Sequence, residues 1–87
     1  MGINTAVVGL GSNIDPEENI EKAREAIASE FKVIKSSLFV ETEPIGYKEQ
    51  RSFLNGALLI ETDMDVHSLK SWLMALESDM GRVRSDN

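Results

Sequence analysis

The fold begins with residues 3–18, INTAVVGLGSNIDPEE, which carry an apolar stretch, a glycine-rich loop and a helix start in direct succession. The apolar stretch ends at Leu10 and is short and rich in Val and Ala, which is typical of a buried strand. The helix start combines an acidic N-cap at Asp15, proline at the first helical position and Glu18 three residues after the cap. This stretch therefore predicts a strand that leads through a turn into a helix.

The rest of the chain supplies two more strands and a second helix. Residues 33–42 and 53–62 are rich in β-branched and aromatic residues, which favours strands. Between Asp65, a second N-cap, and Gly81, the apolar residues follow a near-heptad stripe that predicts a helix. The order strand, helix, strand, strand, helix predicts a ferredoxin-like α/β (α+β) fold with an antiparallel sheet, from which the final strand is missing.

The missing final strand would lie beside the first strand in the complete fold. Without it, the apolar strand at residues 3–10 becomes an exposed edge, whose free N–H and C=O groups tend to recruit another strand. Two explanations stay open. Either Asn87 is not the natural end of the protein, or a second subunit covers the edge in a homo-oligomer.

Length and composition allow one small globular domain, residues 1–87. The chain is 41% hydrophobic and 28% charged, which is ordinary for a globular protein with a single thin core. Its net charge of −6 argues against binding to nucleic acid or to an anionic membrane surface. The sequence contains no Cys, no apolar run long enough to span a membrane and no signal-peptide pattern. We expect a soluble, cytoplasmic protein.

The glycine-rich loop, GLGSN at residues 9–13, is the first candidate for a functional element. It is not a dinucleotide-binding fingerprint, because Ile14 stands where the third glycine would be, and no P-loop lysine follows. Two interpretations stay open. The loop is either a tight turn that only connects strand and helix, or a place where small residues let a ligand approach the backbone.

Three further groups of side chains could bind a ligand. Arg82 and Arg84 stand out in an acidic chain and, on an extended segment, would point the same way and bind phosphate oxygens. Asn55 shares a strand face with Phe53, so an amide and an aromatic plane could hold a flat heterocycle. Glu77 lies one turn before the arginines and could orient Arg82 or a ligand hydroxyl. Each group also has a purely structural interpretation. The arginines would interact favourably with the dipole of the helix before them, Asn55 would be a structural hydrogen-bonding amide, and Glu77 would lie on a solvated helix face.

Taken together, these motifs resemble a known family. In order, GLGSN at 9–13, ETEPIG at 41–46, FLN at 53–55, and Glu77 followed by GRVR at 81–84 are similar to 6-hydroxymethyl-7,8-dihydropterin pyrophosphokinases of the folate pathway. The match covers essentially the whole chain, and four motifs at matching separations are more specific than any one of them. The resemblance implies transfer of the terminal pyrophosphoryl group of ATP to the hydroxymethyl oxygen of the pterin, with AMP released and two magnesium ions assisting.

The resemblance also implies roles for individual residues. The residues that would border the pterin are Thr42, Pro44, Ile45, Phe53 and Asn55. In this pattern the ring of Phe53 stacks on the pterin and the amide of Asn55 reads its amide edge. Arg82 and Arg84 match arginines at the start of a catalytic loop that contact the phosphates, and Glu77 matches a helix carboxylate near the nucleotide.

The family's magnesium ligands do not occur in this sequence. They are two aspartates spaced Asp-x-Asp after a Trp-Gly-Pro-Arg segment, and both would lie downstream of Asn87. Asp63 and Asp65 have the right spacing but precede the second helix, so no metal role is assigned to them. We therefore expect this chain to be the N-terminal part of a pyrophosphokinase domain and inactive alone. The alternative is a complete, non-catalytic relative that binds pterin or oligomerises.

Overall fold

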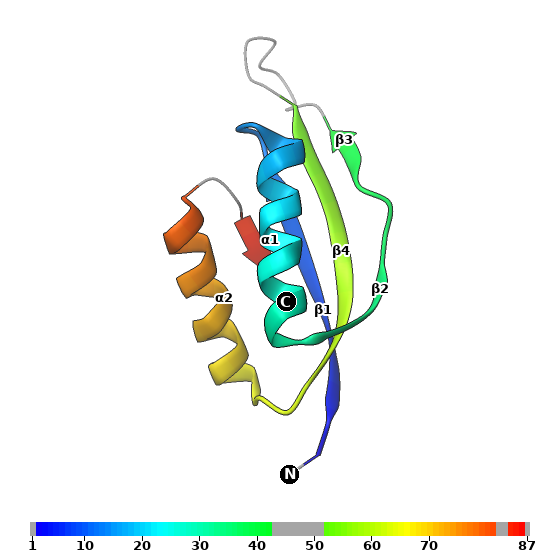
Figure 1. Cartoon of the computed structure of the whole chain (residues 1–87), viewed down its shortest axis with the longest axis vertical. Coiled ribbons are helices and arrows are strands. Elements are labelled where there is room, and N and C mark those ends of the chain that lie inside the picture. Colours follow the sequence, from blue (N-terminus) through cyan, green and yellow to red (C-terminus); the bar gives the residue numbers. More distant parts are fainter. Residues whose placement is uncertain (1, 43–51, 82–83, 87) are drawn as a thin grey trace.

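The computed structural model describes residues 2–42, 52–81 and 84–86 (Figure 1). In chain order the elements are β1 (Asn4–Ser12), α1 (Pro16–Glu30), β2 (Lys32–Ser36), β3 (Val40–Thr42), β4 (Phe53–Thr62), α2 (Val66–Met80) and β5 (Arg84–Asp86). The strands form one antiparallel sheet in the order β2-β4-β1-β5, with β3 also paired to β4. Both helices lie against one face of the sheet, which confirms the predicted fold class.

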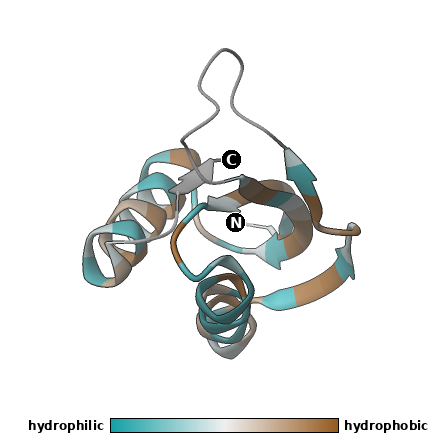
Figure 2. Ribbon diagram, turned by 90° about the horizontal axis from the view of Figure 1, so that it is seen from above, coloured by the Kyte–Doolittle hydropathy of each residue, from teal (hydrophilic) through white to brown (hydrophobic). Residues whose placement is uncertain are grey.

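Alternation along the two central strands puts the core on the helix side of the sheet. Val8 of β1 and Leu58 and Ile60 of β4 are at most 1% exposed. The buried core consists of Val8, Leu10, Ile20, Ala23, Ile27, Phe31, Leu58, Ile60, Leu69 and Leu73. Outside its apolar stripe α1 is hydrophilic (Figure 2). At the end of α1 the ring of Phe31 meets Trp72 of α2 edge-on, with 4.9 Å between centroids, and this contact ties the two helices together.

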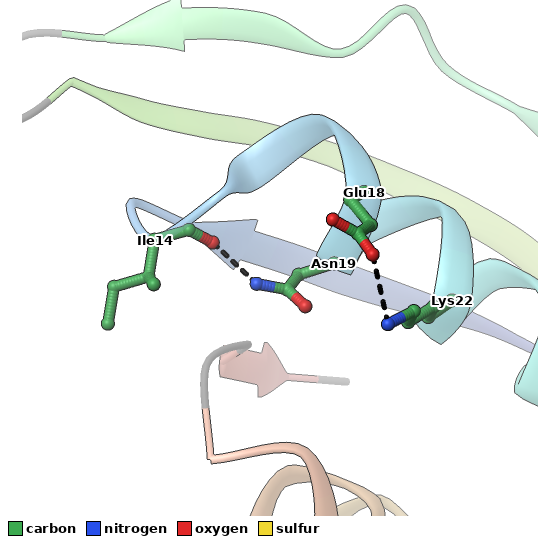
Figure 3. Close-up of polar contacts among 4 residues, drawn as sticks. All are labelled: Ile14, Glu18, Asn19 and Lys22. Atoms are coloured by element: carbon green, nitrogen blue, oxygen red, sulfur yellow. Dashed lines mark hydrogen bonds and ion pairs between the residues drawn. The ribbon is translucent and has the colours of Figure 1, made fainter.

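The turn between β1 and α1 is held differently from the prediction. Asp15 occupies the N-cap position, but it has a left-handed φ of 39° and its side chain makes no capping hydrogen bond. Two other side chains tie the turn instead. Asn19 Nδ2 donates to the carbonyl of Ile14 at 2.6 Å (Figure 3). Ser12 Oγ donates to the same carbonyl at 3.0 Å. An exposed ion pair of 3.1 Å joins Glu18 and Lys22 in the first turns of α1.

Both predicted ends of α2 are confirmed. Asp65 is the N-cap, and its carboxylate accepts a hydrogen bond from the backbone N–H of Ser68 at 2.7 Å. Gly81 ends the helix in the left-handed conformation, with φ 64°, and its N–H donates to the carbonyl of Glu77 at 2.8 Å. Neither helix among the described residues has the length and hydropathy that a membrane-spanning helix needs.

The second predicted strand, residues 33–42, is divided into β2 and β3. The division falls at Ser37, whose backbone N–H donates to the carbonyl of Ala57 at 2.8 Å. The N–H of Ala57 in turn donates to the side-chain oxygen of Ser37, also at 2.8 Å. Because a hydroxyl takes the place of a backbone acceptor, the chain leaves the ladder here and returns with Val40 opposite Asn55.

The edge of β1, predicted to be fully open, is partly covered. β5 pairs with residues 9–11 of β1, with Arg84 opposite Gly11, Ser85 opposite Leu10 and Asp86 opposite Gly9. The expectation that no strand lies beside β1 is therefore corrected over these three residues: the chain just after α2 uses the free backbone groups of the β1 edge. Among the described residues, positions 4–8 of β1 pair only with β4.

Candidate functional site

A pocket of about 310 Å³ opens on the sheet face opposite α1 and α2, which we call the outer face. Alternation assigns residues to this face: Val7 is 58% exposed, whereas its neighbour Val8 is fully buried on the helix side. Gly9 and Gly11 of β1 share the face of Val7. The described residues that line the pocket are Gly9, Leu10, Gly11, Thr42, Phe53, Asn55 and Gly56. The pocket therefore lies where β1, β3 and β4 meet.

The amide of Asn55 is the main polar group of the pocket. Asn55 is half-buried and lies between Gly11 of β1 and Val40 of β3 in the sheet register. Its Nδ2 donates to Thr42 Oγ1 at 2.7 Å, which fixes one end of the amide. Within the described part of the chain, no other hydrogen bond of this side chain is found, so a second N–H and the carbonyl oxygen remain for a ligand to use.

The ring of Phe53 provides an aromatic wall beside this amide. Phe53 is opposite Thr42 in the β3–β4 pairing and two residues before Asn55, which puts all three residues on the outer face. The prediction that Phe53 and Asn55 share one face is confirmed. An aromatic ring and a half-satisfied amide in one small pocket can hold a flat heterocycle by stacking and by edge hydrogen bonds.

The remaining predicted site residues are distributed differently. Pro44, Ile45 and Arg82 lie outside the described residues. Arg84 begins β5, with its backbone opposite Gly11, so that Val40, Asn55, Gly11 and Arg84 form one row across four strands.

Glu77 lies in the last turn of α2 and is half-buried. It is not among the described residues that line the pocket.

The structure decides between the two interpretations of the GLGSN segment that the sequence analysis left open. The tight-turn interpretation is wrong for residues 9–12, because β1 runs on to Ser12 and stays paired with β4 throughout. Gly9 and Gly11 instead line the pocket. The Gly-x-Gly spacing was the available signal, since two glycines separated by one residue fall on the same face of a strand that continues.

Of the two aspartates with Asp-x-Asp spacing, Asp65 has a structural role at the start of α2. Asp65 caps α2, and this lowers its pKa from the ordinary value of 3.8, mainly because the charged carboxylate accepts the backbone N–H of Ser68. Within residues 2–42, 52–81 and 84–86, no three His, Asp or Glu side chains gather to hold a metal ion. The described residues therefore do not fit the two magnesium ions that the resemblance implies.

Comparisons with known proteins agree on one family. A family model described as 7,8-dihydro-6-hydroxymethylpterin-pyrophosphokinase matches residues 7–87. The chain is 36% identical over 86 residues to 2-amino-4-hydroxy-6-hydroxymethyldihydropteridine pyrophosphokinase of Bacillus subtilis, covering 93% of this chain and 50% of that protein. It is 34% identical over 83 residues to the protein of the same name from Haemophilus influenzae, covering 92% and 52%. The chain thus spans about half the length of these relatives.

A longer relative extends the comparison to a eukaryote. The folic acid synthesis protein FOL1 of Dictyostelium discoideum is 33% identical over 85 residues, which cover 97% of this chain and 13% of that protein.

Proposed function

The chain belongs to the 7,8-dihydro-6-hydroxymethylpterin-pyrophosphokinase family, and from this membership we propose that the whole protein transfers pyrophosphate from ATP to 6-hydroxymethyl-7,8-dihydropterin. The terminal pyrophosphoryl group passes to the hydroxymethyl oxygen of the pterin and AMP leaves, a step of folate biosynthesis. The observation that carries this proposal is the outer-face pocket, which both Phe53 and Asn55 line.

The pocket supports a pterin as the bound heterocycle. Its volume of about 310 Å³ is at the small end of the ~300–1,000 Å³ range of ligand sites, which suits a compact two-ring molecule. Stacking on Phe53 holds the plane, and the free N–H and carbonyl oxygen of Asn55 match the acceptor and donor of the pterin's amide edge. In this proposal Thr42, Pro44 and Ile45 complete the border of the pterin site.

The phosphate side of the proposal rests on the arginines after α2. Transfer of a phosphoryl-type group depends mainly on positioning and on charge stabilisation, so an acidic protein of net charge −6 needs local cations for ATP. The backbone of Arg84 lies two strands from Asn55 in the sheet, with Gly11 of β1 between them. We assign Arg82 and Arg84 to the phosphates as the catalytic residues, and Glu77 to the nucleotide.

No step is assigned to a metal ion on this chain. Magnesium in this family would neutralise phosphate charge when bound, and its ligands are expected beyond Asn87. The proposed substrates are small molecules, and the acidic charge argues against nucleic acid and anionic membrane surfaces as partners. We place the protein in the cytoplasm, with ATP as co-substrate.

The second candidate function is a non-catalytic module that binds pterin or oligomerises. The observation that favours it is the β1 edge at positions 4–8, which pairs only with β4 among the described residues. The coding sequence beyond Asn87 separates the two candidates. A Trp-Gly-Pro-Arg segment followed by Asp-x-Asp supports the enzyme, and an immediate stop codon together with a dimer in solution supports the module.

Removing the Asn55 amide tests the pterin site. Calorimetry with 6-hydroxymethyl-7,8-dihydropterin should show that Asn55→Ala weakens binding by about 1–3 kcal/mol, because polar groups of the ligand lose their partner. The matched control is Asn4→Ala, which removes an exposed amide at the far end of β1 and should leave the affinity unchanged. Equal affinities for wild type and Asn55→Ala would place the pterin elsewhere.

A further inference from the structure

Gly11 stands in a paired strand, where glycine is normally unfavourable. It lies opposite Asn55 on one side and Arg84 on the other, inside regular ladder pairing. Among the described glycines only Gly81 has a positive φ, so the backbone at Gly11 does not need glycine's conformational freedom. A strand glycine with ordinary dihedral angles often marks a place where another group approaches closely. The reason for glycine at this position therefore lies in the space around it.

That space is filled by the amide of Asn55. A Cβ added at Gly11 would lie 2.5 Å from Asn55 Oδ1 and 3.6 Å from its Cγ. The shorter distance is well inside the roughly 3.3 Å at which a carbon and an oxygen come into contact. Any side chain at position 11 therefore requires the Asn55 amide to move.

The amide is also held at its other end. Asn55 Nδ2 donates to Thr42 Oγ1 at 2.7 Å, across β4 from Gly11. The amide nitrogen is thus fixed by the Thr42 hydroxyl, and the amide oxygen lies over the backbone of Gly11, which carries no side chain. A Cβ at Gly11 would displace the oxygen and turn the whole planar amide, which would stretch the bond to Thr42.

We propose that Gly11 is a positioning residue for Asn55. The absent side chain provides the space in which the amide lies, and so sets the direction in which the pocket presents its free N–H and carbonyl oxygen. The arrangement is a property of the ligand-free protein. Only the identity of the ligand, a pterin, rests on the function proposed above.

A stability cycle tests the contact without any ligand. Urea unfolding is measured for the wild type, Gly11→Ala, Asn55→Ala and the double variant. Gly11→Ala should lower the unfolding midpoint when Asn55 is present. In the Asn55→Ala background the same substitution should leave the midpoint unchanged or raise it, because alanine at position 11 then meets no amide and is favoured over glycine in a strand. An equal loss in both backgrounds, or no loss in either, overturns the proposal.

The same cycle decides the matter if Gly11→Ala alone does not fold. A folded double variant then supports the proposal, because shortening residue 55 removes the obstacle. A double variant that is as unfolded as Gly11→Ala overturns it, provided that Asn55→Ala folds, since the defect then does not arise from the amide.

An orientation readout separates positioning from a general structural effect. In ¹⁵N–¹H spectra, the Asn55 side-chain protons should exchange slowly in the wild type and in Thr42→Ser, which keeps the hydroxyl. They should exchange faster in Thr42→Val and in Gly11→Ala. Unchanged exchange in folded Gly11→Ala overturns the proposal.

Ligand affinity gives the last comparison. Where the wild type binds 6-hydroxymethyl-7,8-dihydropterin, Gly11→Ala should weaken binding by about tenfold, the loss of one hydrogen bond, and should have no further effect in the Asn55→Ala background. A further loss there overturns the proposal. If the wild type binds no pterin, the proposed function fails, while the stability cycle and the exchange rates still decide the role of Gly11.

Discussion

Three residues on two strands, β3 and β4, define the chemistry of the outer-face pocket. Phe53 contributes a ring, Asn55 an oriented amide, and Thr42 the hydroxyl that holds this amide at 2.7 Å. None of the three belongs to the buried core, so each can be exchanged without removing core packing. Binding and folding should therefore respond separately to substitutions here.

Phe53→Leu is the direct test of stacking. Leucine keeps an apolar side chain of similar size but removes the aromatic plane, so pterin affinity should fall by about 0.5–1.5 kcal/mol. The midpoint of urea unfolding should change little, because Phe53 is only half-buried. Fluorescence titration with the pterin measures the affinity. Val7→Ala is the control, an exposed residue on the same face outside the pocket; a similar loss in both variants would argue against stacking.

At the scale of single elements, the N-terminus of α2 depends on one carboxylate. Asp65 accepts the Ser68 N–H at 2.7 Å, and this bond lowers the pKa of Asp65 below its ordinary 3.8. A carboxyl group with a lowered folded-state pKa stabilises the fold above its unfolded pKa, and this contribution is lost as the pH falls through the folded value. α2 should therefore be weakened by acid at its first turn.

Asp65→Ala should lower the unfolding midpoint at pH 7, and the difference from wild type should shrink below about pH 4 as the wild-type carboxylate is protonated. Urea unfolding at several pH values measures this. Asp63→Ala is the control, because it removes an exposed carboxylate two residues away that makes no cap. A difference that stays constant down to the acid end would mean that the cap does not depend on charge.

The two helices and the strands that became β1 and β4 were predictable from the sequence, because local signals determine them. Asp65 and Gly81 end α2 by short-range hydrogen bonds, which a linear pattern reveals. The division at Ser37 was not predictable, since it depends on a hydroxyl that reaches Ala57 on another strand. The same holds for the pairing of Arg84 with Gly11, a contact between residues 73 positions apart. The site residues could be chosen by pattern, but the fit of Asn55 over Gly11 needs three-dimensional register.

For the whole molecule, the described residues form the outer-face pocket, to which we assign the pterin, but no cluster of metal-binding side chains. Among the described residues no group of acidic or histidine side chains fits a metal, while the relatives from Bacillus subtilis and Haemophilus influenzae are about twice as long. Residues 1–87 alone should therefore release no AMP from ATP in the presence of 6-hydroxymethyl-7,8-dihydropterin. Chromatographic detection of AMP checks this, with the full-length Bacillus subtilis relative as positive control. Pterin-dependent AMP release by this chain would show that the expected downstream ligands are unnecessary.

The most direct test of the pterin site is a map of contacts between 6-hydroxymethyl-7,8-dihydropterin and the protein by intermolecular nuclear Overhauser effects. We predict contacts from the pterin protons to the Phe53 ring and to the Asn55 side-chain amide, on the outer face. Contacts confined to the helix side, or a bound pterin that leaves both side chains unperturbed, would contradict the assignment.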